Sequence, residues 1–599
     1  MKIAENRTLS AVLVFLAAFL VYANSITASF HWEDEYLIRD NVHIRRLVNI
    51  PVFFKPGYID VYESGAGKRY RPLRTVSLAV DYQLWGPDPR GYHLTNVLLH
   101  AAASVAVWLF CLGVSGNAVT ALFAGLLFAV HPVHAESVAW VKNRSDVLCA
   151  LFFFLSAAAF AFFRRRGSGT LYAASLILAL PAFLAKEMAL ALPPLAALVL
   201  VFFNVKEGSP PLRGWRSLLP FIALLGGYML FRSTSLAGGV DIALPLPTRL
   251  LLVLNTVGEY LKLLIWPVNL VVDRSIPSAA LASLPGLLLC AGGLALLPLL
   301  YRSGKIEGLF WLLAFLLLAA PVLNLVYIPG RPLAEQRMYL PSAAFCAFCA
   351  WLFAEAVGSA RERLRRAALF CLACALVFFS VRSVLRNLDW RSEVRLWEKT
   401  VEAAPSQRSY NNYAVVLLKE KRYGEAIGNA LKSLAIDPAY VDAYNTLGAA
   451  YHDLGLYSKS AGAFEQAVRF SGGKAYKSLM NLATVYSLQG REKEAMGIYL
   501  GVVKDAPWSD TAYHNLGLTL FRLGRKEDSA RAFREATALN PYDSAAWLML
   551  GRIAVERGEV KEAVRVYYSM LSVAPAAASE FLATNPALRA HIDASRASP

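Results

Sequence analysis

The sequence predicts an all-α protein in two parts, a polytopic bundle of about eleven membrane-spanning helices followed by a soluble solenoid of helical repeats. Three observations predict this fold. Of the 599 residues, 56% are hydrophobic and the mean hydropathy is +0.43, which is rare for a soluble protein. Apolar runs of membrane-spanning length fill residues 10–385. Residues 387–599 instead carry frequent charges at amphipathic spacing and repeat themselves with a period near 34 residues.

The domain boundaries follow from this contrast. We expect a membrane domain at 1–386, a junction like half a repeat at 387–406, five repeats at 407–577 and a C-terminal tail at 578–599. The spans are expected near residues 10–28, 92–114, 118–132, 145–163, 170–186, 188–205, 217–231, 281–301, 308–328, 338–357 and 366–384. The first span begins like a signal peptide. A cut after Ala28 would leave Ile26 where a small residue is required, so we interpret this span as an uncleaved anchor.

Basic residues predict the orientation of the spans. The chain has a net charge of +17, and many of its basic residues lie in short loops between apolar runs: Arg164, Arg165, Arg166, Lys206, Arg213, Arg216, Arg302, Lys305, Arg361, Arg363, Arg365 and Arg366. A cytoplasmic N-terminus places all of them on the cytoplasmic side, as the positive-inside rule requires. We therefore expect a multi-pass protein of the lipid bilayer with no nucleic-acid partner. Residues 29–91, four later loops and the repeats then face the periplasm of a bacterium or the ER lumen.

Residues 250–266 decide whether this orientation holds for the second half of the membrane domain. Counted as a span, this segment would invert everything that follows it. It contains Asn255, Glu259 and Lys262, and a charge at mid-bilayer costs about 2.5–3.5 kcal/mol. We therefore expect an interfacial or half-inserted helix on the outer face.

The repeats in the second part are defined by their small residues and prolines. Small residues recur at spacings of 34, 35, 34 and 34, as Ala414, Gly448, Ala483, Gly517 and Gly551. Prolines that end a repeat recur as Pro438, Pro507, Pro541 and Pro575. These segments resemble tetratricopeptide repeats, whose helix pairs stack around a concave groove. Such a groove usually binds a peptide or helix; a spacer or oligomerisation arm is the alternative.

The loops expected outside are rich in ionisable residues. The first contains Glu33, Asp34 and Glu35 in the stretch HWEDEY, and later Arg71. The other loops add His131, His134, Glu136, Arg144, Asp146, Lys186, Glu187, Arg232, Asp273, Arg274, Arg331, Glu335, Arg337 and Tyr339. A carboxylate beside a hydroxyl can act as a general base, and arginines can grip a phosphate bidentately. The loops therefore predict a site on the outer face.

Each of these patterns also has a plainer interpretation. The acids could form a solvated turn, and the basic residues could anchor lipid head groups. His131-x-x-His134 could bind a metal, but Pro132 prevents the helical spacing of zinc proteases. No cofactor is therefore firmly expected, and a divalent cation, Mg²⁺ or Mn²⁺, is the one that stays open. A transporter is disfavoured because no span carries paired charges or an evident inverted repeat.

The order of the motifs carries a family resemblance. FHWED is followed by YRPL, GYHLTNVLLH, LLFAVHPVHAESVAWVKNRSD, LAKEMA, AEQRMYLPS and RNLDWRSEVRLW, and then by the repeats. Each motif is weak alone, but this order is specific and covers nearly the whole chain. The chain resembles the transmembrane and tetratricopeptide-repeat-containing O-mannosyltransferase-like family, within the GT-C glycosyltransferases.

The resemblance implies a GT-C-like membrane domain that transfers a sugar, mannose in this family, from a polyprenyl phosphate to a protein Ser or Thr hydroxyl. It implies a catalytic carboxylate in the first outer loop: Asp34 as the base, supported by Glu33, with Glu35 beside them and the choice among the three open. The implied donor-phosphate residues are Arg144, Lys186, Arg331 and Arg337. The implied pocket residues are His131, His134, Glu136, Arg71, Asp146, Glu335 and Tyr339. The repeat groove would bind a protein or peptide acceptor. The alternative is a non-enzymatic scaffold whose repeats bind envelope or luminal proteins.

Overall fold

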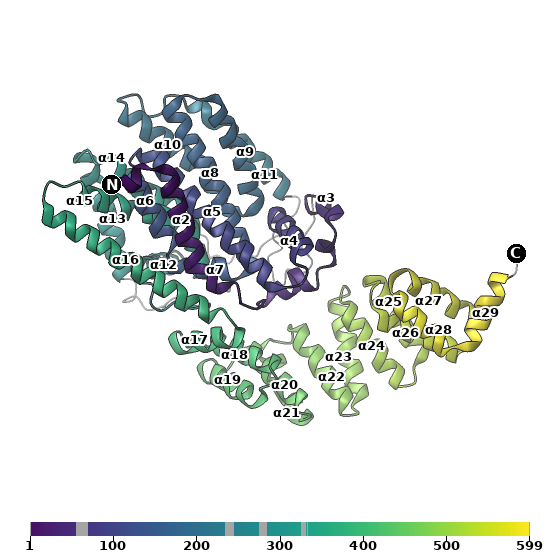
Figure 1. Ribbon diagram of the computed structural model, residues 1–599. Coiled ribbons are helices and arrows are strands. Elements are labelled where there is room, and N and C mark those ends of the chain that lie inside the picture. Colours follow the sequence, from purple (N-terminus) through teal and green to yellow (C-terminus); the bar gives the residue numbers. More distant parts are fainter. Residues whose placement is uncertain are drawn as a thin grey trace. The chain divides into compact units, whose positions relative to one another are not determined.

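The computed structural model describes residues 2–55, 70–233, 245–274, 284–324, 331 and 333–597. These residues form helices and their connections, and the only β pairing among them is an isolated bridge between Arg274 and Leu333 (Figure 1). The predicted all-α class is confirmed. The chain divides into two compact units, residues 1–404 and 405–599. By its contacts, most of the predicted junction at 387–406 is part of the first unit.

The first unit contains seventeen α-helices among the described residues. They are α1 (Lys2–Glu5), α2 (Arg7–Tyr22), α3 (Ile50–Phe53), α4 (Pro72–Trp85), α5 (Pro89–Ser115), α6 (Ala118–Ala129), α7 (Ala135–Ala139), α8 (Arg144–Arg166), α9 (Gly169–Ala185), α10 (Leu192–Lys206), α11 (Leu219–Ser233), α12 (Leu246–Ile265), α13 (Leu284–Arg302), α14 (Ile306–Ala319), α15 (Tyr339–Val357), α16 (Glu362–Asp389) and α17 (Glu393–Ala403). Shorter turns that matter for the site are η2 (Glu35–Arg39), η5 (Pro132–His134), η6 (Val141–Asn143), η7 (Glu187–Ala191) and η11 (Glu335–Met338).

Each of the eleven predicted spans coincides with a helix in the described part of the chain. Seven helices there are long and apolar enough to cross a membrane, or eight if the bent pair formed by α6 and residues 132–139 is one span. The helices α9, α11 and α14 have 17, 15 and 14 residues, so the count of eleven is approximate. Parts of the predicted spans 281–301 and 308–328 lie outside the described residues. The segment predicted to be interfacial forms α12.

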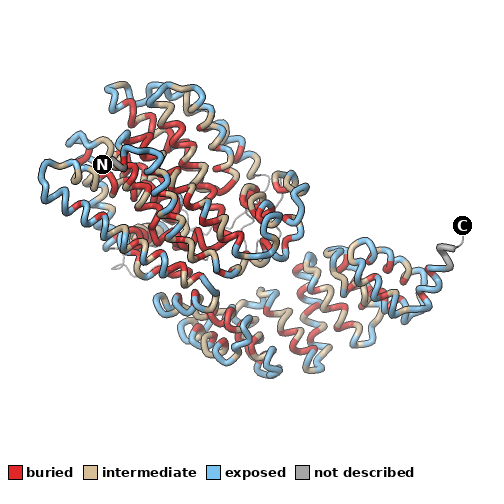
Figure 2. The backbone as a smooth tube through the Cα atoms, in the orientation of Figure 1, coloured by how far each residue is buried: buried red, intermediate tan, exposed pale blue. Residues whose placement is uncertain are grey.

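The core of the membrane unit lies around α5 and α8, which are red along most of their length in Figure 2. Their apolar windows are each 72% buried within the protein, whereas those of α13 and α16 are 11% and 22% buried. The exposed side chains of these outer helices are apolar, such as Leu288 on α13 and Phe370 on α16. An apolar surface of this extent suits contact with lipid.

The second unit is a stack of helix pairs. They are α18 (Gln407–Lys419) with α19 (Tyr423–Ile436), α20 (Val441–Asp453) with α21 (Tyr457–Phe470), α22 (Tyr476–Leu488) with α23 (Glu492–Asp505), α24 (Asp510–Arg522) with α25 (Lys526–Leu539), and α26 (Ser544–Glu556) with α27 (Val560–Val573). The five predicted repeats are these five pairs. Beyond them, the predicted tail contains most of α28 (Pro575–Thr584) and all of α29 (Pro586–Ala597).

The recurring small residues let the paired helices approach closely. A β-carbon at Gly448 would lie 2.7 Å from the ring of Phe464, and one at Gly517 would lie 2.8 Å from the ring of Phe533. Both distances are shorter than carbon atoms tolerate without a shift of the ring. The spacing of 34 residues therefore reflects one packing contact repeated along the solenoid.

Candidate active site

The acidic loop, which we define as residues 29–34, follows the first membrane helix. It is held by hydrogen bonds to a buried carboxylate, that of Asp34. Asp34 is fully buried, and its two carboxylate oxygens accept hydrogen bonds from the backbone N–H groups of His31 (3.1 Å) and Lys142 (2.7 Å). Glu33 pairs with the ammonium of Lys142 at 2.5 Å, and 19% of its side chain is exposed. Glu35 begins η2 and pairs with Arg39 on the surface. The three acids therefore have three different surroundings.

Burial makes the Asp34 carboxyl a weaker acid than an exposed aspartate. The pKa of Asp34 is raised from 3.8 to about 7: desolvation by burial is the largest cause and the charge of Glu33 adds to it, while the two backbone hydrogen bonds and Lys142 oppose the rise. A carboxyl in this surrounding exchanges its proton near neutral pH.

Five consecutive residues, 142–146, join the acidic loop to three other groups of charged side chains. Lys142 contacts Glu33, and the Asn143 side chain donates to the side chain of Gln336 at 2.5 Å. Residues 144–146 then contact Asp81, Arg71 and Lys186, in that order. This stretch begins in η6 and continues into the first turn of α8, so its side chains radiate in different directions. It places the predicted residues of separate loops in one connected polar network.

The second charged group surrounds Glu136, which is fully buried on α7. Its carboxylate accepts from the Arg331 guanidinium at 2.6 Å and from the backbone N–H of Gln336 at 3.1 Å. Arg337 donates to the carbonyl oxygen of Arg331 at 2.6 Å. The predicted residues Glu136, Arg331 and Arg337 therefore lie together, connected through Gln336 and Asn143 to the acidic loop.

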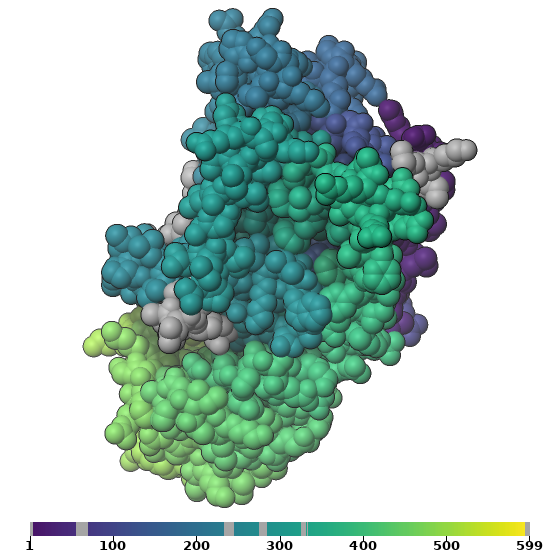
Figure 3. Space-filling model, turned by 90° about the vertical axis from the view of Figure 1, so that its left-hand side faces the viewer, coloured from purple at the N-terminus to yellow at the C-terminus, as the bar shows by residue number. Residues whose placement is uncertain are grey.

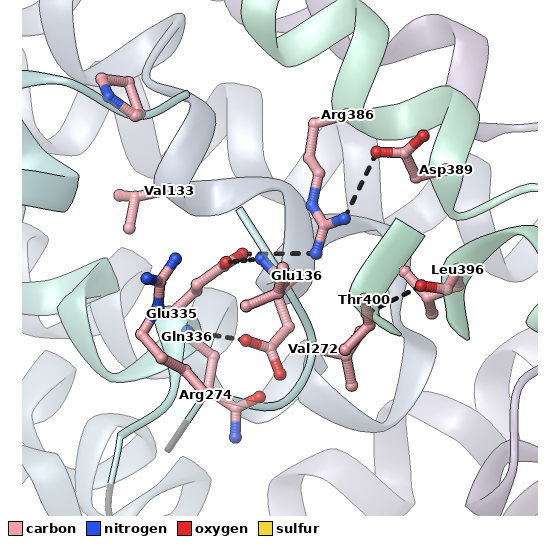
Figure 4. Close-up of polar contacts among 12 residues, drawn as sticks. Val133, Glu136, Val272, Arg274, Glu335, Gln336, Arg386, Asp389, Leu396 and Thr400 are labelled. Carbon is pink, nitrogen blue, oxygen red and sulfur yellow. Dashed lines mark hydrogen bonds and ion pairs between the residues drawn. The ribbon is translucent and has the colours of Figure 1, made fainter. Parts of the chain in front are cut away.

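Glu335 is turned toward another arginine. Its carboxylate lies 3.6 Å from the guanidinium of Arg386, which also pairs with Asp389 at 3.3 Å (Figure 4). The side chains of Glu335 and Arg386 are each 1% exposed. A buried pair of this kind favours contact between its two segments, here η11 and the end of α16, because separating them leaves the buried Glu335 carboxylate without its cation.

The third charged group lies where α4, α8 and η7 meet. The Lys186 ammonium pairs with Asp146 at 2.5 Å, and the Arg71 guanidinium pairs with Glu187 at 2.8 Å. Arg232 of α11 lies 4.0 Å from Glu187. The first two cations are buried, so the predicted residues Arg71, Asp146 and Lys186 form a compact network of paired charges.

Arg144 is fully buried and its polar atoms are occupied by the protein. It pairs with Asp81 at 2.6 Å and donates to the Asn96 side chain at 2.6 Å and to the carbonyl oxygen of Tyr92 at 2.9 Å. These partners come from α4 and α5, so Arg144 ties both helices to the start of α8. This arrangement suits a structural ion pair better than a contact with a diffusible phosphate.

His131, His134 and Tyr339 are buried in the core of the first unit. Pro132 interrupts the helix, and α6 and the following helical turn meet at 49°. The His131 ring contacts the carbonyl oxygen of Leu264 at 3.0 Å, and the His134 ring contacts the Ser342 hydroxyl at 2.8 Å. The Tyr339 hydroxyl contacts the ring of His100 at 2.7 Å. These contacts satisfy polar groups near the break in the helix.

His131 and His134, whose spacing could suit a metal, do not belong to a larger group of metal-ligating side chains in the described part of the chain. Among the residues that the structure describes, no three His, Cys, Asp or Glu side chains are grouped so as to hold a metal ion. Both ring nitrogens of His131 are engaged, with the carbonyl oxygen of Leu264 and the backbone N–H of Val133, and one ring nitrogen of His134 is engaged with Ser342.

An apolar cavity of about 350 Å³ lies between α12, α13, α14 and α15. Figure 3 shows the face of the membrane unit that carries these helices, drawn in teal and green. The cavity is lined by residues that include Gly293, Leu316, Phe348, Tyr260 and Met338. Tyr260 lies within hydrogen-bonding reach of Arg337 and of the backbone of Ala334. The cavity is therefore apolar along its length and has an arginine of the second charged group next to it.

Several residues of the network were absent from the predicted site, among them Asp81 and Asn96, the partners of Arg144. Lys142 and Asn143 lie inside the motif HPVHAESVAWVKNRSD, Gln336 lies inside AEQRMYLPS, and Arg386 and Glu393 lie inside RNLDWRSEVRLW. Membership of a motif was the only signal for them, and it does not distinguish a residue at the site from a neighbour. Their partners are distant in the chain: Glu393, for example, accepts a hydrogen bond from the backbone N–H of Trp32, 361 positions away. No local pattern indicates such a contact.

Comparison with known proteins gives relatives for both units. The family description "Tetratricopeptide repeat" matches residues 514–580. The chain is 24% identical to protein O-mannosyl-transferase TMTC3 of Homo sapiens, over 91% of this chain and 66% of that protein. It is 29% identical to protein O-mannosyl-transferase Tmtc1 of Drosophila melanogaster, over 72% of this chain and 62% of that protein. The chain thus spans about two thirds of the length of the curated relatives it matches.

A solved structure, described as "YrrB: a TPR protein with an unusual peptide-binding site", is 20% identical, with a TM-score of 0.27, over 31% of this chain and 97% of that one. The relatives named protein O-mannosyl-transferase cover both units of this chain, and the repeat description falls within the second. The expected resemblance of the chain to the transmembrane and tetratricopeptide-repeat-containing O-mannosyltransferase-like family is therefore confirmed.

Proposed function

We propose that the chain is a membrane glycosyltransferase that moves a sugar, mannose, from a polyprenyl-phosphate donor to a Ser or Thr hydroxyl of a protein. The name shared by its relatives, protein O-mannosyl-transferase, supports the sugar and the acceptor class. The observation that carries the proposal is the Glu33–Asp34 pair, held against residues 142–146 beside the charged groups of the outer loops.

Burial divides the work between the two acids. A general base must come within hydrogen-bonding distance of the hydroxyl that it deprotonates. Asp34, the base favoured by the resemblance, is fully buried with both oxygens hydrogen-bonded to backbone N–H groups, whereas Glu33 keeps 19% of its side chain exposed. We therefore assign the proton transfer to Glu33 and the positioning of the loop to Asp34.

The reaction balances with these groups. The acceptor oxygen attacks the anomeric carbon of the sugar, and its proton passes to the Glu33 carboxylate. The bond between that carbon and the phosphate oxygen breaks, and the electron pair leaves with the lipid phosphate. Attack opposite the leaving group inverts the anomeric centre. Cations near the phosphate stabilise the charge that develops on it.

Arg331 and Arg337 are the cations that we assign to the donor phosphate. Arg331 keeps 24% of its side chain exposed, and Arg337 lies beside Tyr260 at the apolar cavity. A polyprenyl chain in this cavity would place its phosphate near both arginines. Arg144 and Lys186, which the resemblance implied for the same task, are buried and paired with Asp81 and Asp146. We assign those two to the support of residues 142–146.

The repeats supply the acceptor in this proposal. Solenoids of helix pairs offer a groove in which extended or helical peptides bind. We place both the site and the repeats on the extracytoplasmic face, where the positive-inside rule puts the loops that carry the acids. A lipid-linked donor at the membrane surface and a protein acceptor would then meet on one side of the bilayer.

Transfer of labelled mannose from polyprenyl-phosphate mannose to protein tests the proposal. We expect activity in the wild type and a loss of about 10²–10⁴-fold in Glu33→Gln at equal expression. Glu35→Gln is the control, because Glu35 pairs with Arg39 on the surface, and it should keep its activity. Full activity of Glu33→Gln together with an inactive Asp34→Asn variant would return the base to Asp34. No donor consumption by the wild type would favour the non-enzymatic scaffold.

A further inference from the structure

The turn after the last membrane helix contacts the acidic loop directly. The His31 ring lies 2.7 Å from the carbonyl oxygen of Trp390, and the Glu393 carboxylate accepts from the backbone N–H of Trp32 at 2.6 Å. Trp390 is fully buried. Glu393 begins α17, whose residues belong to the first compact unit together with the loop. About 360 residues of sequence therefore separate two segments that touch at the residue next to the acids.

Trp32 has a backbone conformation that a bulky residue rarely adopts. Its φ is +40°, in the left-handed region. A residue other than glycine, asparagine or aspartate costs of order 1–3 kcal/mol there, so the surroundings must hold it in place. The hydrogen bond from the Trp32 N–H to a carboxylate is of the stronger, charge-assisted kind. Glu393 is therefore a contact that stabilises this conformation.

The Trp32 ring is held by the same segment. It meets the rings of Trp397 and Trp140 edge to face, at centroid distances of 5.6 Å and 4.9 Å. Trp140 in turn stacks on Trp390 at 6.0 Å. Edge-to-face pairs of this size add about 0.5–1.5 kcal/mol each beyond their buried area. Backbone and side chain of Trp32 are thus both fixed by residues 390–397 and by Trp140.

From these contacts we propose that Glu393 is a positioning residue for the Glu33–Asp34 pair. Because the two acids follow Trp32 directly, a rotation of the Trp32 backbone would swing Glu33 away from Lys142 and Asp34 away from the backbone N–H of His31. Glu393 acts through Trp32 and touches neither donor nor acceptor. This inference rests on the proposed function only for the catalytic consequence; the contact and its effect on the tryptophans stand without it.

Three variants of the full chain test the role of Glu393. Glu393→Ala removes the acceptor of the Trp32 N–H, whereas Glu393→Gln keeps a carbonyl oxygen at that place. Glu398→Ala is the matched control, because Glu398 lies on the same helix and is exposed. The measurements are kcat and KM for polyprenyl-phosphate mannose and for an acceptor protein, together with the near-ultraviolet circular dichroism of the tryptophans.

We expect Glu393→Ala to lower kcat about 10–100-fold with both KM values unchanged, and to alter the tryptophan circular dichroism. Glu393→Gln should restore most of kcat and of the spectrum, and Glu398→Ala should match the wild type. An unchanged kcat and spectrum in Glu393→Ala would overturn the proposal. So would equal losses in the alanine and glutamine variants, because the charge rather than the hydrogen bond would then matter.

If the wild type transfers no sugar, the proposed function fails, while the spectra still decide whether Glu393 holds Trp32. If Glu393→Ala does not fold, the spectrum and kcat of Glu393→Gln decide: wild-type values support the role, and altered values in a folded protein refute it.

Discussion

Replacing Asp34 by asparagine tests whether the acidic loop is as deeply buried as its contacts indicate. The fully buried carboxyl has a pKa of about 7 in the folded protein and 3.8 as its unperturbed value. The difference of about three units corresponds to about 4 kcal/mol. Since the folded pKa is raised, this contribution to stability is fully present below pH 3.8 and is lost as the pH rises through 7. Asparagine does not titrate, so the variant lacks this dependence.

The variant also carries a constant cost. An asparagine side chain can accept only one of the two backbone hydrogen bonds, from His31 or from Lys142, and the N–H group left without a partner costs about 1–3 kcal/mol. Asp34→Asn should therefore be less stable than the wild type at pH 4. Relative to the wild type, it should gain about 3 kcal/mol between pH 4 and pH 7 and level off above about pH 8.

Thermal unfolding of the purified chain in detergent between pH 4 and pH 9 measures this difference. Asp40→Asn, a change of an exposed carboxyl that follows the same loop, controls for the loss of a negative charge. Parallel curves of Tm against pH for the wild type and Asp34→Asn would refute the reasoning. In that case the Asp34 carboxyl would ionise in the folded protein as it does in the unfolded chain, and the loop would be open to water.

Two further predictions concern the apolar cavity and the repeats. Gly293→Leu should raise KM for polyprenyl-phosphate mannose about tenfold in transfer assays, because a side chain there enters the cavity and displaces roughly two methylene contacts. Gly292 lies on the same helix but outside the cavity lining, so Gly292→Leu should leave KM unchanged. Gly517→Ala should lower the free energy of unfolding of the repeats by about 1–3 kcal/mol, because the new β-carbon would lie 2.8 Å from the ring of Phe533. Gly497 has open space around it, so Gly497→Ala should raise that free energy by about 0.5–1 kcal/mol. Calorimetry of the full chain measures both changes.

Much of the architecture could be predicted from local patterns. The repeat period is such a pattern, because each helix pair contacts only its neighbours and every copy needs a small residue where Gly517 meets Phe533. The apolar runs predicted where helices would form, since a bilayer requires internally hydrogen-bonded backbone. The number of spans could not be predicted as well, because α9, α11 and α14 are shorter than a typical membrane-spanning helix. Apolar sequence alone does not show whether such short helices cross the bilayer.

The sequence by itself determined which residues were candidates for the site: an acid triplet after the first predicted span, arginines in the loops predicted to lie outside, and the motif that ends in residues 142–146. Only the tertiary structure decided which of these residues meet. Asp34 and Glu33 are adjacent in sequence, yet one is buried between two backbone N–H groups and the other reaches Lys142 and solvent. Likewise, the contact of Trp32 with Glu393 joins positions 361 residues apart. Burial and pairing of this kind depend on packing between distant segments. The local sequence does not predict which segments will come into contact.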